Sequence, residues 1–576
     1  MAEPDGSRVL EGLSLDEAWR HLRWIEEHAP ARISGTPDQI RAGQYLADEL
    51  EALGIDTHLD TFTGYRSMPG PARLTVLSPS EREYRAVACG HIDSTPDEGL
   101  DLELLYLGGG AVEDYDGRDV RGKAVLTEIS SGPSRPEKAH IAADRGAAAV
   151  IFVTWGHPEY ETIPSGAIKC AWGNPTRATI SDIPRIAAMG ITRAAGDDLI
   201  EMLATGPVRA RVVAQASRDW GHMTQPWARL RAPKNPSGDF LLVGGHYDAW
   251  QPGMTDNAAG NALILELARV FAASAGELTR DIVFALWNGH EIGDYEGSTW
   301  FADRYWDELD DHCVAYLNVD SIGFAHSDFY LADSTPELTR FHQDVERRVL
   351  GVETAHRHLG RDNEHPFFGL GLPALEGRFH FSEEQIEEWG GARGSWWWHS
   401  PDDTLDKIDP DRFEAHARVY ASYVWEMCTA PVLPFDYRVS ADHIRSSLEE
   451  MRTIAGERFD LELPLEPFAQ AADELSEAAG RPHNEAQTQR LNAGLMQIAR
   501  LLLPAFETWG GRYAQDRVGH AALSSPIPAL HDLTLLTKTD PDADLSHQLN
   551  TELLRARNRL SDALRRATAE ARASLP

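Results

Sequence analysis

Apolar runs and amphipathic helical patterns alternate through the first three quarters of the chain. Runs over 240–244, 281–287 and 314–319 are almost wholly apolar and predict buried strands, and a helical pattern covers 257–271. Strands that alternate with helices predict an α/β fold with a central mixed, mostly parallel sheet and flanking helices.

Two other regions have a different pattern. Between about 103 and 215, strand patterns at 123–127 and 147–153 flank a helical pattern at 139–145, which indicates a small β-rich or α/β unit. From about residue 435 long helical patterns predominate and predict a C-terminal helical domain. These patterns cover 440–455, 466–480, 485–508 and 545–573.

Composition narrows the class of protein. The 576 residues include 54 Lys and Arg against 90 Asp and Glu, so the formal net charge is −36. Nucleic acid and anionic membranes bind basic surfaces, so neither is an expected partner. The N-terminus has no signal-peptide pattern, no run of 18 apolar residues occurs, and the four cysteines form no CxxC pair. Together these features predict a cytoplasmic protein.

Imidazole and carboxylate side chains gather where the predicted strands end. Because the carboxyl ends of parallel strands meet at one edge of a sheet, we expect these side chains to lie close together. Without cysteine, such ligands suit zinc, and five of them can hold two ions when one carboxylate bridges the pair. The side chains are His246, Asp248, Asp256, His290, Glu291, Asp320 and His399.

The motifs His246-Tyr-Asp248, Asp256-Asn-Ala-Ala-Gly and His290-Glu291, followed by Asp320 and His399, resemble those of the co-catalytic zinc exopeptidases. That family includes bacterial aminopeptidases, glutamate carboxypeptidase II and the transferrin receptor. The resemblance implies two zinc ions, with other divalent metals as an alternative.

In the roles that this resemblance implies, His246 and Asp320 bind one ion, Glu291 and His399 bind the other, and Asp256 bridges them. Asp248 would orient His246 as a catalytic-site residue.

The resemblance also implies a domain organisation. Residues 1–62 and 236–432 would form the peptidase-like domain, in two parts, with the metal site in the second part. Residues 63–235 would be an inserted protease-associated domain. Residues 433–576 occupy the place of the family's helical dimerisation domain, so a homodimer is expected.

One residue departs from the family's pattern. The family's general base is the first Glu of a Glu-Glu pair, and here the pair reads His290-Glu291. Moving the register by one residue would leave Ile292 as a metal ligand, which an alkyl side chain cannot be. Three interpretations of His290 stay open: it is the general base, it joins the metal shell, or peptide hydrolysis has been lost.

The loop after this pair is one residue longer than in the family. Its Asp294 and Glu296 could supply a replacement carboxylate, or they could be solvated loop charges.

A segment before His399 resembles the substrate pocket of the glutamate carboxypeptidase branch. Asn363 and Arg378 match its polar residues, His380 replaces its second Arg, and Trp398 stands in the place of its Tyr. Arg378 would bind a substrate carboxylate, or it would pair with a nearby acid.

These features predict a metal-dependent hydrolase that cleaves an amide bond in a small peptide-like substrate. Two alternatives remain. The first is a non-peptidase enzyme on the same metal site, either a hydrolase of other amides or a lyase. The second is a non-catalytic binding or scaffold protein like the transferrin receptor.

Overall fold

The computed structural model describes residues 6–360 and 366–576. In this part of the chain the strands join into one 13-stranded mixed sheet, in the order β1-β2-β6-β5-β4-β3-β7-β9-β8-β10-β13-β11-β12. The strands are β1 (Asp56–Ser78), β2 (Arg82–Ala88), β3 (Leu100–Tyr106), β4 (Ala124–Glu128), β5 (Ala149–Val153), β6 (Ala187–Ile191), β7 (Arg209–Leu230), β8 (Phe240–His246), β9 (Asp281–Trp287), β10 (Cys313–Asn318), β11 (Phe329–Ser334), β12 (Ala355–His358) and β13 (Ala374–His380).

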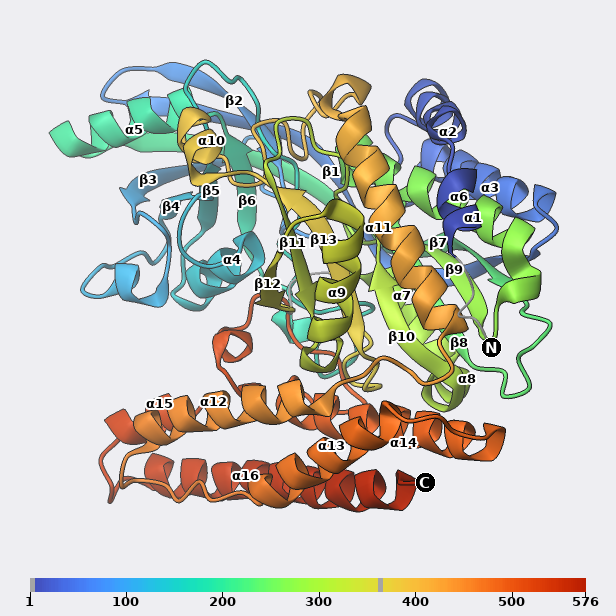
Figure 1. The fold of residues 1–576 in the computed structure, drawn as a ribbon. Coiled ribbons are helices and arrows are strands. Elements are labelled where there is room, and N and C mark those ends of the chain that lie inside the picture. Colours follow the sequence, from blue (N-terminus) through green and yellow to red (C-terminus); the bar gives the residue numbers. More distant parts are fainter. Residues whose placement is uncertain (1–5, 361–365) are drawn as a thin grey trace.

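Helices flank the sheet and form a separate layer at the C-terminal end of the chain (Figure 1). They are α1 (Ser7–Gly12), α2 (Leu15–His28), α3 (Pro37–Ala52), α4 (Arg135–Asp144), α5 (Arg193–Thr205), α6 (Ala259–Ser274), α7 (Glu296–Arg304), α8 (Trp306–His312), α9 (Thr339–Leu350), α10 (Glu383–Glu388), α11 (Pro410–Thr429), α12 (Tyr437–Ala455), α13 (Leu465–Ala479), α14 (Glu485–Phe506), α15 (Leu533–Lys538) and α16 (Asp544–Ser574).

The three apolar runs form adjacent parallel strands, as predicted. β9, β8, β10 and β13 run parallel, and every residue of β8, β9 and β10 is buried. Helix α6 packs on this part of the sheet and is buried along most of its length. The predicted class, a mixed and mostly parallel α/β fold with a C-terminal helical region, is confirmed.

Residues 74–214 contain a hydrophobic core of their own, around the parallel strands β3, β4, β5 and β6. Strands β1 and β7 pair with each other along most of their length and connect this unit to the part of the sheet that contains β9, β8 and β10. Strand β1 therefore runs through the predicted boundary at residue 62. The name protease-associated domain stays a prediction for this unit.

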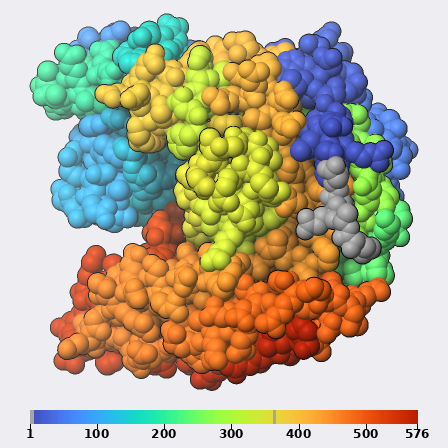
Figure 2. Space-filling view, in the orientation of Figure 1, coloured from blue at the N-terminus to red at the C-terminus, as the bar shows by residue number. Residues whose placement is uncertain are grey.

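The C-terminal helices α12 to α16 form a slab along one side of the molecule (Figures 1 and 2). Their apolar residues belong to the same core as α6, β8 and β10, so the slab packs on the part of the chain that contains these elements. The connection between α14 and α15 contacts the 74–214 unit, because its Arg517 forms a 2.9 Å ion pair with Glu137. Dimerisation through the slab stays a prediction.

Among the described residues one stretch, Met254–Glu277, is long and apolar enough to cross a membrane by length and composition alone. Its most apolar window is 72% buried inside the protein, where α6 is a core helix. This stretch is therefore weak support for a membrane span.

Two close approaches at the edge of the sheet where β8 and β10 end require glycine. A Cβ atom on Gly260 would lie 2.2 Å from Asn257 Oδ1 and 2.5 Å from the carbonyl oxygen of Val319, and one on Gly245 would lie 2.3 Å from the same carbonyl. These glycines allow α6 to begin directly against the ends of β8 and β10.

We expect Gly260→Ala to lower the free energy of unfolding by about 1–3 kcal/mol, because the buried neighbours of Gly260 must move to admit a methyl group. The matched control is Gly276→Ala, where the added Cβ would meet nothing within 4 Å. Chemical denaturation of both variants tests this; equal stability would contradict it.

Candidate active site

The carboxyl ends of β8, β9 and β10 bring the predicted residues to one edge of the sheet. His246 is the last residue of β8, Glu291 follows β9, and Asp320 follows β10. Asp256 lies in the turn between β8 and α6. His399 lies in the loop before α11, with a left-handed φ of 55°, a conformation that is uncommon for a non-glycine residue.

The carboxylate of Asp256 stands between the two imidazoles. Its Oδ1 lies 2.9 Å from His246 Nε2, and its Oδ2 lies 3.2 Å from His399 Nε2. A second acid completes each side: Asp320 Oδ1 is 3.5 Å from His246 Nε2, and Glu291 Oε2 is 3.0 Å from His399 Nε2. The site thus consists of two His–acid pairs that share one carboxylate.

Three buried carboxylates in one cluster require compensating positive charge. Burial alone would lower the pKa of His246, but Asp320 and Asp256 outweigh it and raise that pKa well above the usual value. Against the same effect of burial, Glu291 and Asp256 raise the pKa of His399 to about 9. The carboxylates therefore favour a cation at each imidazole.

The donor set fits divalent metal. Two ligands at about 2.1 Å from a tetrahedral zinc ion lie roughly 3.4 Å apart, and the four nitrogen–oxygen separations here are 2.9–3.5 Å. Glu291 Oε1 is buried without a hydrogen-bond partner among the described residues, as expected for an oxygen atom that binds a metal ion.

His290 lies beside the His246–Asp320 pair. Its ring stacks on His246 with 3.9 Å between centroids and an interplanar angle of 9°, and it meets Tyr295 edge-on. One ligand atom each from His290, His246 and Asp320 lie within 4.8 Å of one another. This position suits both a proton acceptor and a metal ligand, so both interpretations stay open here.

Asp248 contacts His246 differently from the prediction. The backbone carbonyl oxygen of Asp248 lies 2.9 Å from His246 Nδ1, whereas its carboxylate Oδ1 is 3.9 Å away. The carboxylate instead accepts hydrogen bonds from the backbone N–H groups of His290 and Glu291, each at 3.1 Å. Its side chain therefore positions the segment that carries these two residues.

Two residues that the predicted site did not include hold the turn at Asp256. Asp403 accepts hydrogen bonds from the backbone N–H and the hydroxyl of Thr255 and from the N–H of Asp256. Arg32 is fully buried and donates to the carbonyl oxygens of Tyr247, Pro252 and Gly253. Burial lowers the pKa of Arg32 to about 10, against the opposing effect of Asp403 and Asp248.

A cavity of about 470 Å³ opens over the metal-site residues. Three parts of the chain line it. Arg135 and Trp155 belong to the 74–214 unit, Arg378 and Trp398 lie in β13 and in the loop before α11, and Val518 belongs to the C-terminal region. The 74–214 unit also contacts His399, one of the candidate metal-binding residues, because the carbonyl oxygen of Ser165 lies 3.1 Å from His399 Nδ1.

The predicted substrate residues have different surroundings. Arg378 lines the cavity, and its Nη1 also lies 3.3 Å from the buried carboxylate of Glu376. His380 lines the cavity, and burial next to Arg378 lowers its pKa to about 3, so it is neutral. Asn363 lies outside the described residues.

The three consecutive tryptophans divide between cavity and core. Trp398 lines the cavity and donates a 2.8 Å hydrogen bond from Nε1 to Asp256 Oδ2, while its ring stacks on His399. Trp397 is 1% exposed and packs in a small aromatic core. Trp398 therefore touches the shared carboxylate itself, which the sequence did not indicate.

Arg135 is a further cavity residue that the sequence did not single out. It begins α4, and Nη1 donates a 2.8 Å hydrogen bond to the carbonyl oxygen of Ser165. No ion pair within the described residues involves it, and burial lowers its pKa. A cation in this position can bind an anionic group of a ligand in the cavity.

The lengthened loop after Glu291 does not carry solvated charges. The side chains of Glu296 and Lys169 are both fully buried and form an ion pair of 3.4 Å. Lys169 Nζ also donates to the carbonyl oxygens of Gly173 and Gly293. The interpretation of Glu296 as a solvated loop charge is wrong, because its side chain is buried and paired with Lys169 of the 74–214 unit. Asp294 lines the cavity, and burial raises its pKa to about 7.

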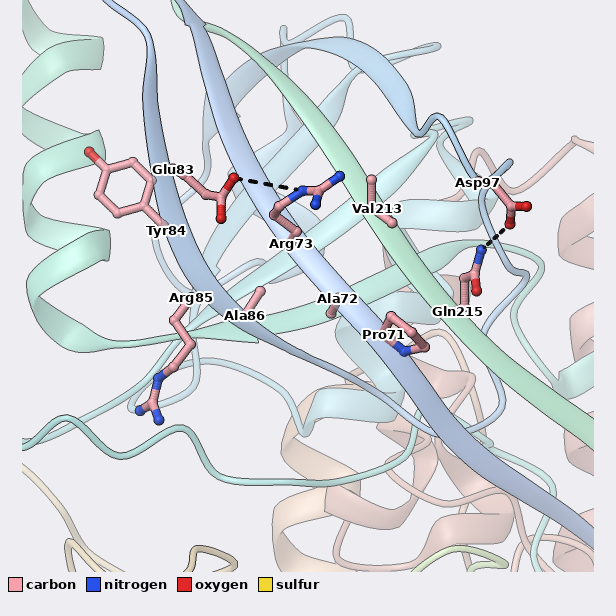
Figure 3. Close-up of a pocket in the computed structure, with 10 residues that line it drawn as sticks. All are labelled: Pro71, Ala72, Arg73, Glu83, Tyr84, Arg85, Ala86, Asp97, Val213 and Gln215. Carbon is pink, nitrogen blue, oxygen red and sulfur yellow. Dashed lines mark hydrogen bonds and ion pairs between the residues drawn. The ribbon is translucent and has the colours of Figure 1, made fainter.

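A second hollow, of about 540 Å³, lies on β1, β2 and β7 (Figure 3). Its charged side chains pair locally, as Arg73 does with Glu83 at 3.8 Å. It contains none of the predicted site residues.

Residues 228–424 match the model of peptidase family M28. We call this stretch the M28 segment. The match includes all five candidate metal ligands together with His290 and Asp248. The predicted resemblance is therefore confirmed at the level of family, and it supports the prediction of a metallo-hydrolase.

Relatives of the M28 segment extend over most of the chain. "Probable glutamate carboxypeptidase VP8" of Zea mays is 23% identical over 509 residues, which cover 74% of this chain and 69% of that protein. The structure of BSAP, a zinc aminopeptidase from Bacillus subtilis, is 20% identical and covers 72% of this chain and 95% of its own, with a TM-score of 0.55. A peptidase M28 precursor from Shewanella amazonensis SB2B is also 20% identical, with a TM-score of 0.60 over 74% of this chain and 97% of its own. The two structures share the fold.

We expect Lys169→Met to lower the free energy of unfolding by about 3–5 kcal/mol at pH 8.5, because a buried carboxylate then loses its ammonium partner. Burial already raises the pKa of Glu296 to about 8, so the protonated form stabilises the folded chain at acid pH and this contribution is lost as the pH rises. The deficit of the variant should therefore be smaller at pH 5.5 than at pH 8.5.

The double variant Lys169→Met/Glu296→Gln is the control for this prediction and should recover part of the stability at pH 8.5. Denaturation curves at both pH values measure the effect; a deficit that does not depend on pH would contradict the burial of charge as its cause.

Proposed function

We propose that the chain is a zinc-dependent exopeptidase that holds two ions and cleaves an amide bond in a small peptide with a free carboxylate. The observation that carries this proposal is the carboxylate of Asp256, within 3.2 Å of both imidazoles at the base of an open cavity.

The residues that would hold the two ions follow from the two His–acid pairs. His246 and Asp320 would hold one, Glu291 and His399 the other, and Asp256 would bind both through its two oxygens. When bound, zinc polarises the scissile carbonyl group and lowers the pKa of the attacking water. The names of the zinc aminopeptidase and carboxypeptidase relatives support this choice of metal.

His290 would accept the proton of the attacking water and return it to the leaving amine. Imidazole is well suited to both transfers near neutral pH. The ring of His290 stacks on His246, and its backbone N–H donates a hydrogen bond to Asp248. The ring is therefore held beside the candidate metal ligands. A ring held there would be available for both transfers.

Two cations define the proposed substrate. Arg135 lines the cavity from the 74–214 unit, and Arg378 lines it from β13. Either guanidinium can bind a carboxylate through paired N–H groups. Arg378 is partly neutralised by Glu376, whereas Arg135 has no carboxylate partner among the described residues. Trp155 and Trp398, with ring centroids 5.5 Å apart, would provide an apolar wall for the rest of the ligand.

A cytoplasmic location and a homodimer through the C-terminal helices belong to the same proposal. The four buried cysteines, all without a disulfide, are consistent with a reducing compartment. Light scattering of the purified chain tests the dimer.

We expect His290→Ala to lower kcat about 10²- to 10⁴-fold on a dipeptide while the metal content stays unchanged, because the variant loses its proton acceptor. His290→Glu should restore much of this loss, since a carboxylate can take the same proton. Kinetics and elemental analysis of the native chain and both variants measure this. The control is His547→Ala, which removes an exposed imidazole.

If the native chain binds metal but cleaves no peptide, and His290→Glu does, the peptidase proposal fails and other chemistry on the same site is favoured. If the native chain binds no metal, the proposal also fails and a scaffold role is favoured.

We expect Arg135→Met to lower kcat/KM about 10- to 100-fold for a peptide with a free carboxylate, since a charge-assisted hydrogen bond to the ligand is lost. The same peptide with an amidated C-terminus should show little change. The matched control is Arg145→Met, which alters the residue directly after the same helix, outside the cavity. Equal losses on both peptides would mean that Arg135 does not read the carboxylate.

A further inference from the structure

We propose that His358, His443 and Glu507 form a second divalent-metal site, separate from the candidate active site, with zinc as the best-suited ion. His358 ends β12, His443 lies on α12, and Glu507 directly follows α14. Strand β12 belongs to the M28 segment, and α12 and α14 belong to the C-terminal slab (Figure 1). We call the three residues the junction site.

The ligand atoms of the junction site converge. His358 Nε2 lies 2.9 Å from Glu507 Oε2, and His443 Nε2 lies 3.8 Å from Glu507 Oε1. One ligand atom from each of the three residues lies within 4.8 Å of the other two. Ligands of one tetrahedral zinc ion lie roughly 3.4 Å apart, a value between these two separations.

The same measure applies to the active site, where the nitrogen–oxygen separations are 2.9–3.5 Å. The junction site is therefore only slightly wider than the site that the M28 segment provides. Two imidazoles and one carboxylate are also the ligand set of open zinc sites, which leave a position for water.

The imidazole rings of His358 and His443 stack on one another, and they share one carboxylate. Their centroids are 4.2 Å apart with an interplanar angle of 25°, and both Nε2 atoms approach the same carboxylate. Two protonated rings at this distance would repel, and each neutral ring would have to carry its proton on Nε2 to donate to Glu507. A divalent cation satisfies both nitrogens and the carboxylate at once.

The surroundings leave room for an ion and its water. The carboxylate of Glu507 is 9% exposed, and the side chains of His358 and His443 are 32% and 28% exposed. A cavity of about 430 Å³ adjoins them, and Ser446, Glu450 and Ser525 also line it. An ion bound here would crosslink β12 with α12 and the end of α14, and so fasten the slab to the catalytic part of the chain.

The first experiment compares metal content. The native chain, His443→Gln and the control His547→Gln are stripped with chelator, reloaded with zinc, separated from free ion and measured by elemental analysis. We expect His443→Gln to hold one zinc ion fewer per chain than the native chain and the control. Equal content in all three would overturn the proposal.

This difference does not depend on how many ions the active site holds. The junction site can therefore fail while the proposed peptidase stands, and the reverse is also possible.

A second experiment leaves the junction site intact, in case His443→Gln does not fold. The full chain with His246→Gln and His399→Gln lacks the imidazoles of both His–acid pairs at the active site. We expect this chain to bind one Co²⁺ ion with the visible absorption of a tetrahedral centre, and its unfolding temperature to rise with zinc. Absence of both effects would overturn the proposal.

Discussion

The arrangement around the active-site edge depends on the cost of gathering carboxylates away from water. Asp256, Glu291 and Asp320 lie together at the ends of the buried parallel strands, and two imidazoles stand between them. Such a cluster is stable only with compensating cations. The surrounding chain supplies part of this compensation through the buried guanidinium of Arg32 and leaves the rest to whatever binds the imidazoles. Metal binding and folding of this edge are therefore linked.

The part of the fold that positions the site was predictable because its signals are local. The apolar runs of β8, β9 and β10 could only be buried strands, and their polar ends then had to meet at one edge. His246, Glu291 and Asp320 follow from this reasoning alone. His399 required the family resemblance, since its loop has no regular pattern that would bring it to the sheet.

The remainder could not be read from the sequence because it depends on distant contacts. Strands β1 and β7 carry mixed polar residues with interruptions such as Pro69 and Gly70, so their long pairing becomes visible only in three dimensions. Nothing in the sequence around Arg135 connects the start of α4 with a cavity formed largely by the M28 segment. Glu296 looked like a loop charge because its partner, Lys169, lies in another part of the fold.

The paired strands β1 and β7 also bear on how the cavity can change its width. They are bonded to each other along nearly their whole length and continue from the 74–214 unit to β9 of the catalytic sheet. The register shifts between Pro69 and Ala72 and between Val76 and Ser78, and the pairing is otherwise continuous. Tilting of the unit would therefore move Arg135 and Trp155 together toward or away from Arg378. The same ribbon bonds to the end of β9, through Thr224 and Gln225 to Asn288, so the cavity wall and the segment that leads into His290 share one support.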